Sequence, residues 1–186
     1  AYWHHHHGFN PVNEGWAYEF FDKNVRNRAS LTEEFRFNTG STTAGFYYKH
    51  LHEQDNAAGY LFGGSVTDAN SSYDFGALAG YAALSKTVSP KLKLKANIRY
   101  EFNEMIYEGN SYGLNANWEK VILPSISFEA DHAMIGYKGA LQYAPDNITN
   151  YFLSISRGYK SGGVNQQPYL ADLNRPFEPE FIQNYE

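Results

Sequence analysis

Apolar and polar residues alternate along several stretches of the chain. The run at 91–102 is the most regular, and its two faces separate Leu92, Leu94, Ile98 and Tyr100 from Lys93, Lys95, Arg99 and Glu101. Successive side chains of a β-strand point to opposite faces, so each such run predicts a strand with one apolar and one polar face. The pattern predicts six strands and the start of a seventh, over 31–38, 42–51, 73–86, 91–102, 132–143, 151–160 and from about 180 onward.

The connections between these strands alternate in length. Turn-forming residues mark short connections at 40–41, 89–90 and 145–150, whereas 52–72, 103–131 and 160–179 are predicted loops of about twenty residues or more. Loops longer than about 12–15 residues are uncommon in compact domains. Strict alternation places every long loop at one end of the sheet, which is the plan of a bacterial outer-membrane β-barrel. Residues 1–28 lack regular alternation and are expected to form a loop region.

Composition is compatible with a barrel but does not decide the class. Aromatic residues make up 17% of the chain, with 16 Tyr and 13 Phe, although the mean hydropathy of -0.56 is that of a polar protein. Outer-membrane barrels place aromatic rings in girdles at the two membrane interfaces. A soluble β-sandwich rich in tyrosine has a similar composition and the same alternation, so both classes stay open at this point.

Several other functional classes are disfavoured. The net charge of -5 and the absence of a basic run give no reason to expect a nucleic-acid partner. No apolar run approaches the ~18 residues of a transmembrane helix. No GxSxG, P-loop or HExxH motif occurs, and cysteine is absent, so we expect neither an enzyme nor a cofactor. The four histidines at 4–7 lack a partner at useful spacing; a solvated loop or a purification-tag remnant explains them better than a metal site.

Five segments resemble barrel strands of TonB-dependent outer-membrane receptors. FLSISRGYKSGGVN at 152–165 is similar to the family's strand ending in Arg-Gly-Tyr-Lys-x-Gly-Gly, and RPFEPEFIQNYE at 175–186 is similar to the Phe-x-Pro-Glu segment that follows an outer loop. LTEEFRF at 31–37, TAGFYYK at 43–49 and KLKLKANIRYE at 91–101 resemble earlier strands, in the family's order. One departure is Thr42, where the family often has Trp. Each motif is weak alone, but five in order are fairly specific.

The resemblance implies an all-β, antiparallel transmembrane barrel of 22 strands around a plug domain, with short periplasmic turns and long extracellular loops. Residues 1–186 would be a partial barrel domain in the outer membrane of a Gram-negative bacterium, in contact with outer-membrane lipid. The implied function is uptake of a scarce solute, often a ferric siderophore, powered by the TonB complex through an N-terminal part that this sequence lacks. A soluble or surface-anchored, adhesin-like β-sheet binding protein is the alternative.

Two sets of residues are candidates for function in such a wall. The polar faces of the strands would line the lumen: Glu34, Arg36, Lys93, Lys95, Arg99 and Lys138. Aromatic residues of the expected outer loops are candidates for ligand contact, because rings give a large contact area at low entropy cost: Tyr60, Phe62, Tyr107, Tyr112, Trp118, Tyr159 and Tyr169. Loop packing or anchoring at the membrane interface is the simpler role for these rings.

Overall fold

The fold is built almost entirely from β-strands. The computed structural model describes residues 2–7, 12–14, 17–61, 64–165 and 174–186. Within them the strands are β1 (Tyr2–His7), β2 (Val12–Glu14), β3 (Ala17–Thr39), β4 (Thr42–Leu61), β5 (Val66–Ser89), β6 (Leu92–Leu114), β7 (Lys120–Ile122), β8 (Ile126–Tyr143), β9 (Tyr151–Lys160), β10 (Gly163–Val164), β11 (Pro176–Phe177) and β12 (Glu180–Tyr185). No helix in these ranges is long and apolar enough to cross a membrane.

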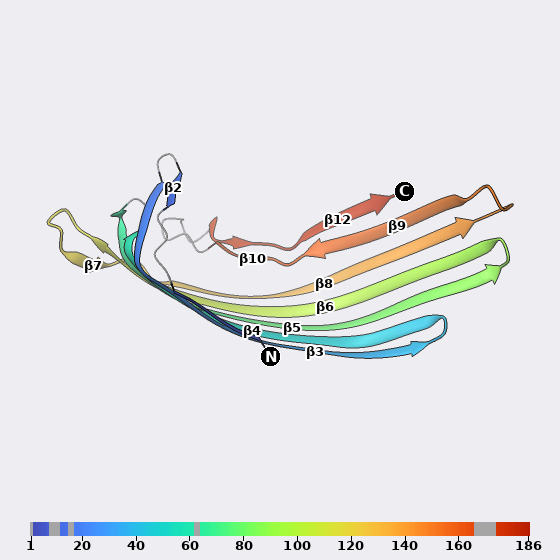
Figure 1. Ribbon diagram of the computed structural model, residues 1–186, viewed down its shortest axis with the longest axis horizontal. Coiled ribbons are helices and arrows are strands. Elements are labelled where there is room, and N and C mark those ends of the chain that lie inside the picture. Colours follow the sequence, from blue (N-terminus) through green and yellow to red (C-terminus); the bar gives the residue numbers. More distant parts are fainter. Residues whose placement is uncertain (1, 8–11, 15–16, 62–63, 166–173) are drawn as a thin grey trace.

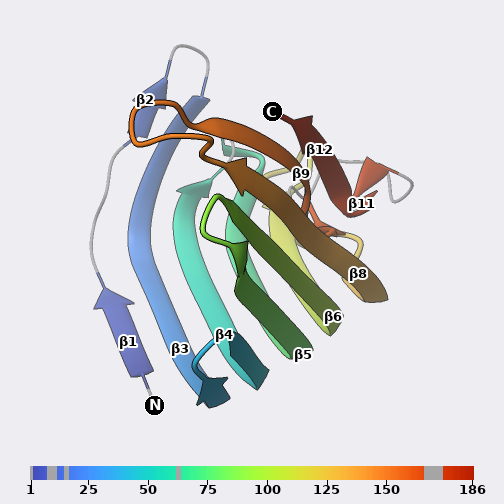
Figure 2. The same ribbon diagram turned by 90° about the vertical axis from the view of Figure 1, so that its right-hand side faces the viewer.

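The strands form one antiparallel meander, as the sequence predicts. The order in the main sheet is β1-β3-β4-β5-β6-β8-β9-β12, with β2 added to the start of β3 and β7 to the end of β6. The six predicted strands and the start of a seventh correspond to β3, β4, β5, β6, β8, β9 and β12. Figure 1 shows these strands running side by side, and Figure 2 shows the sheet curving across them, so that it has a convex and a concave face.

The strands are longer than the sequence predicts. The strands β3, β4, β5 and β6 contain 23, 20, 24 and 23 residues, whereas a tilted membrane strand needs only ~9–11. The predicted long loops at 52–72 and 103–131 are therefore wrong, because most of each is continuous paired strand. The loop region expected over 1–28 is also wrong where the structure describes it, since β1, β2 and the first part of β3 lie there.

The register divides the side chains cleanly between the two faces. Cross-strand pairing aligns Ile98 with Ala82 and Tyr137 in one row of the convex face. Along β6 this face stays apolar from Leu92 to Phe102 and becomes charged beyond that point. The stretch from Leu92 to Phe102 contains eleven residues, which matches the ~9–11 residues of a membrane-crossing strand. We call the convex-face residues of this stretch the apolar belt; between its two limits Leu94, Ala96, Ile98 and Tyr100 are exposed, as a lipid-facing barrel surface requires.

Buried side chains gather on the concave face, at the edge of the apolar belt and beyond it. Met134, which pairs with Glu101, and Met105 are each only 1% exposed there. The connection from β9 to β12 lies against this region, where β10 pairs with β11. We call its described residues, 161–165 and 174–179, the strap. It contacts the sheet at Asn103, whose Nδ2 donates to Ser161 Oγ at 2.9 Å.

Candidate functional site

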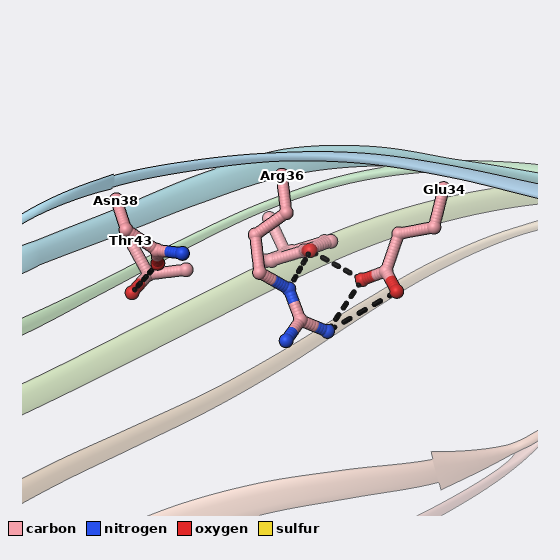
Figure 3. A network of polar contacts seen from close by, with 5 residues as sticks. Glu34, Arg36, Asn38 and Thr43 are labelled. Atoms are coloured by element: carbon pink, nitrogen blue, oxygen red, sulfur yellow. Dashed lines mark hydrogen bonds and ion pairs between the residues drawn. The ribbon is translucent and has the colours of Figure 1, made fainter.

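The polar residues predicted to line a lumen all lie on the concave face. Pairing aligns Arg36, Gly45, Tyr81 and Arg99 in one row across β3, β4, β5 and β6. The remaining predicted residues share the face of this row by alternation: Glu34, Lys93, Lys95 and Lys138. Figure 3 shows Glu34 and Arg36 projecting from β3 to the same side of the sheet. Glu34 and Arg36 belong to one polar cluster, and Arg99 belongs to a second.

The first cluster joins β3 to β5 across the strand between them. Arg36 Nη2 donates to Glu34 Oε1 at 2.9 Å. The Tyr81 hydroxyl donates to Glu34 and accepts from Arg36 Nε at 3.2 Å. To reach them, the Tyr81 ring lies over Gly45 of β4, where an added Cβ would be 2.5 Å from Tyr81 Oη. We call these residues, Glu34, Arg36, Gly45 and Tyr81, the first tyrosine clamp.

The second cluster repeats this arrangement between β6 and β9. Arg99 Nη2 donates to Glu101 Oε2 at 2.6 Å. The Tyr159 hydroxyl accepts from Arg99 Nε at 3.1 Å and donates to Glu101 Oε2 at 3.2 Å. Gly136 of β8 lies opposite Arg99, and a Cβ on it would be 3.0 Å from Tyr159 Cε1. We call Arg99, Glu101, Gly136 and Tyr159 the second tyrosine clamp; each clamp ties three neighbouring strands together on the concave face.

A third group of charged and aromatic side chains lies on the concave face beyond the apolar belt. Arg26 makes a bidentate ion pair with Asp55, with Nε–Oδ1 and Nη2–Oδ2 distances of 2.6 and 2.8 Å. Lys49 Nζ lies 5.7 Å from the centroid of the Phe75 ring, which stacks with Tyr73 at 6.4 Å. We call this group the aromatic–charge cluster; its members are Arg26, Arg28, Lys49, Glu53, Asp55, Tyr73 and Phe75.

Charge and burial shift the pKa values of groups in and beside this cluster. The hydrogen bonds from Arg26 to Asp55 raise the pKa of the guanidinium, so Arg26 carries its positive charge at any physiological pH. Burial raises the pKa of the Tyr73 hydroxyl, and the charge of Glu53 adds to the effect. Burial also raises the pKa of Tyr107, the cross-strand partner of Tyr73. Both tyrosines therefore present neutral rings and hydroxyl donors at neutral pH.

The predicted ligand-contact rings do not form one group. Tyr107 is 4% exposed on the concave face, next to the aromatic–charge cluster, and Tyr159 belongs to the second tyrosine clamp. Tyr112 lies on the opposite face, where Lys120 Nζ is 4.5 Å from its ring centroid. Trp118 is 82% exposed in the turn between β6 and β7. The side chains of the other three lie outside the described residues: Tyr60, Phe62 and Tyr169.

The sequence analysis missed the members of the aromatic–charge cluster. Arg26 and Arg28 lie in the stretch expected to be irregular, and Glu53 and Asp55 lie in a predicted loop. A usable signal was present, because each pair is spaced by two residues and so shares one face of a strand. Opposite charges with this spacing on adjacent strands predict cross-strand ion pairs once the strands are recognised.

Metal ligation finds no support in the described side chains. Among them, no group of three or more His, Asp or Glu residues is close enough to hold a metal ion. The four histidines at 4–7 form part of β1, whose backbone pairs with β3. Their side chains lie outside what the structure describes.

Comparison with known proteins identifies the family. The profile of the TonB dependent receptor-like, beta-barrel family matches residues 1–186. The chain belongs to this family. TonB-dependent receptors are proteins of the Gram-negative outer membrane, so the apolar belt faces outer-membrane lipid and the adhesin-like alternative is not supported.

A solved structure has the same fold. The ferric yersiniabactin uptake receptor FyuA from Yersinia pestis superposes with a TM-score of 0.71 at 15% sequence identity. The aligned region covers 96% of this chain and 28% of that receptor. The chain thus spans less than a third of its structural relative, and at this identity the likeness shows the fold alone. No curated protein matches the sequence.

Proposed function

We propose that this chain forms part of the wall of a receptor that takes up a scarce solute of the ferric-siderophore class, with energy from the TonB complex. Membership of the receptor family supports a transport role rather than an enzymatic one. The similar structure is that of a receptor for ferric yersiniabactin. The TonB complex would act through an N-terminal part of the receptor outside these residues.

The aromatic–charge cluster carries the proposal. It lies beyond the apolar belt on the concave face, which is the outer entrance of a barrel whose short turns face the periplasm. Lys49 contacts the Phe75 ring and has no ion pair among the described side chains. An anionic chelate with flat ligand groups would find there a cation and two stacked rings, which is how aromatic–cation surfaces bind such molecules.

The test uses the full receptor that contains this chain, purified in detergent. Binding of ferric hydroxamate and ferric catecholate chelates is followed by quenching of intrinsic fluorescence. We expect Lys49→Ala to weaken binding of the recognised chelate about five- to tenfold, the range of one desolvated cation–π and charge contact.

The matched control is Tyr100→Ala, which removes a ring from the apolar belt that is 53% exposed on the convex face. It should leave chelate affinity unchanged. Failure of both chelate classes to bind the native receptor would contradict the assignment of the solute class. Equal affinities of the Lys49→Ala and native proteins would remove the aromatic–charge cluster from the binding site.

A further inference from the structure

The charges of the aromatic–charge cluster almost cancel one another. Arg26 is held by Asp55 through two short contacts, and Arg28 Nε lies 3.5 Å from Glu53 Oε2. Lys49 is the cation of this cluster that makes no ion pair with a described side chain. Three cations thus face two carboxylates, and the described cluster has one positive charge in excess, which belongs to Lys49.

This excess charge lies at one end of a pair of stacked rings. Lys49 Nζ lies 5.7 Å from the centroid of the Phe75 ring, and Phe75 stacks with Tyr73 at an angle of 21° between the ring planes. Tyr73 is in turn the cross-strand partner of Glu53. Lys49 and Glu53 share one face of β4 and are separated by roughly 13 Å of strand. The ring pair therefore runs from a cation to a carboxylate.

The two ends restrict the charge that a ligand stacked on these rings can carry. A ligand with one negative charge can place it beside Lys49 and lay an uncharged part toward Tyr73. A ligand with negative charge on every arm presents part of it to Glu53, whose side chain is only 18% exposed, and like charges repel strongly in a partly desolvated site. Arg175 of the strap is 6% exposed and already has a partner, so it adds no free cation.

We propose that the aromatic–charge cluster selects ferric chelates that carry one negative charge and an aromatic arm, and discriminates against chelates with three negative charges. The aromatic arm stacks on Phe75 and Tyr73, and the charged iron centre lies toward Lys49. Lys49 attracts the negative charge of the chelate, whereas Glu53 limits it. This inference rests on the proposed function and narrows its class of solute.

The test uses four ferric chelates, in which catecholate arms replace hydroxamate arms one at a time. Each hydroxamate binds ferric iron as a monoanion and each catecholate as a dianion, so the series runs from a neutral trihydroxamate to a trianionic tricatecholate. Affinity for the full receptor in detergent is measured by quenching of intrinsic fluorescence. We expect the monoanionic chelate, which has one catecholate arm, to bind most tightly and about tenfold more tightly than the tricatecholate.

Three variants separate the roles of the charged residues. Lys49→Gln should weaken binding of the monoanionic chelate about five- to tenfold and leave the neutral trihydroxamate unchanged. Glu53→Gln removes the carboxylate that faces Arg28 and raises the excess charge by one, so the preference for the monoanion over the trianion should shrink to about two- to threefold. The matched control is Glu108→Gln, which changes the net charge equally but on the exposed convex face; it should leave the native preference intact.

The outcomes distinguish this inference from the proposed function. Charge selection would be overturned if the native receptor bound another member of the series as tightly as the monoanionic chelate. The same conclusion would follow if Glu53→Gln and Glu108→Gln changed the preference equally. Either result leaves the proposed function standing, because the receptor would still bind ferric chelates. Binding of none of the four chelates would overturn the proposed function and the charge selection together.

Discussion

Gly45 of the first tyrosine clamp offers the sharpest test of the concave face. Replacing it with alanine places a Cβ against the backbone carbonyl oxygen of Phe35, 2.5 Å from Tyr81 Oη and 2.6 Å from Tyr81 Cζ. Real Cβ contacts are not this short, so the Tyr81 ring has to leave its place over β4 and the backbone at Phe35 has to shift. Gly80 of β5 is the matched control, because a Cβ there meets only Phe46 ring carbons at 3.9 Å, an ordinary contact.

Two opposing effects set the magnitude. Alanine in place of glycine within a strand gains about 0.5–1 kcal/mol, because the unfolded chain loses conformational freedom. This gain applies to both variants. Overpacking costs about 1–3 kcal/mol, and it applies only at Gly45. We therefore expect Gly80→Ala to be neutral or slightly stabilised, and Gly45→Ala to be less stable than Gly80→Ala by about 1–3 kcal/mol.

The measurement is guanidinium unfolding of the full receptor in detergent, with the free-energy difference taken from the shift in midpoint at constant slope. The double variant Gly45→Ala/Tyr81→Ala adds a second check, because removing the ring relieves the overlap with Tyr81 and leaves the overlap with the Phe35 carbonyl oxygen, so only part of the lost stability should return. Gly45→Ala as stable as Gly80→Ala would refute the crossing of Tyr81 over β4. It would also remove the reason for glycine at this position.

Three further outcomes follow from single contacts. Tyr159→Phe keeps the ring over Gly136 but loses the hydroxyl that joins the second tyrosine clamp. Because the clamp is partly exposed to solvent, the free energy of unfolding should fall by only about 0.5–1 kcal/mol. The hydrogen bond from Lys120 lowers the pKa of Asp68, so this pair stabilises the fold above the unfolded pKa of Asp68 and less as pH falls through the folded pKa. Lys120→Met lacks this contribution, so its free energy of unfolding should fall less than that of the native receptor as the pH is lowered. Trp118 has φ of 63°, so Trp118→Gly should stabilise the receptor by about 1 kcal/mol in the same unfolding assay.

The sequence predicts the part of each strand that crosses the membrane and misses the part that continues beyond it. Within 92–102, lipid on one side and a polar lumen on the other impose alternation, and the prediction for β6 is correct there. From Asn103 onward, Glu104 and Glu108 on the convex face alternate with Asn103 and Tyr107 on the concave face. Neither face is consistently apolar, so the period-two signal disappears although the strand does not. The same reason explains the missed extensions of β4 and β5.

The candidate site was predictable only in part. The two-residue spacing of Glu34 and Arg36 places both on the polar face, and this follows from sequence alone. Their partner Tyr81 is 45 residues from Arg36 in sequence, and only the register across β4 brings Gly45 between them. Register depends on turn lengths and bulges at both ends of the strands, so the clamps could not be assembled from local patterns.

The limit of the apolar belt can be tested with two isoleucines on the same strand and face. Ile98 and Ile106 lie on the convex face of β6 with similar exposures of 50% and 46%. In a sheet exposed to water, lysine at either position would have the same small effect. In a bilayer, lysine near the midplane of a barrel costs about 2–4 kcal/mol, and near the interface only about 0–1 kcal/mol.

The two substitutions should therefore differ in the membrane. Ile98 lies within the apolar belt, whereas Ile106 lies beyond it, between Glu104 and Glu108 and opposite Glu129. A lysine at position 106 would also be attracted by these carboxylates. We expect Ile98→Lys to destabilise the receptor by about 2–4 kcal/mol in refolding into lipid vesicles, and Ile106→Lys to be close to neutral. Equal destabilisation by both would show that the membrane boundary does not lie between Phe102 and Glu104, because exposure alone would then decide the outcome.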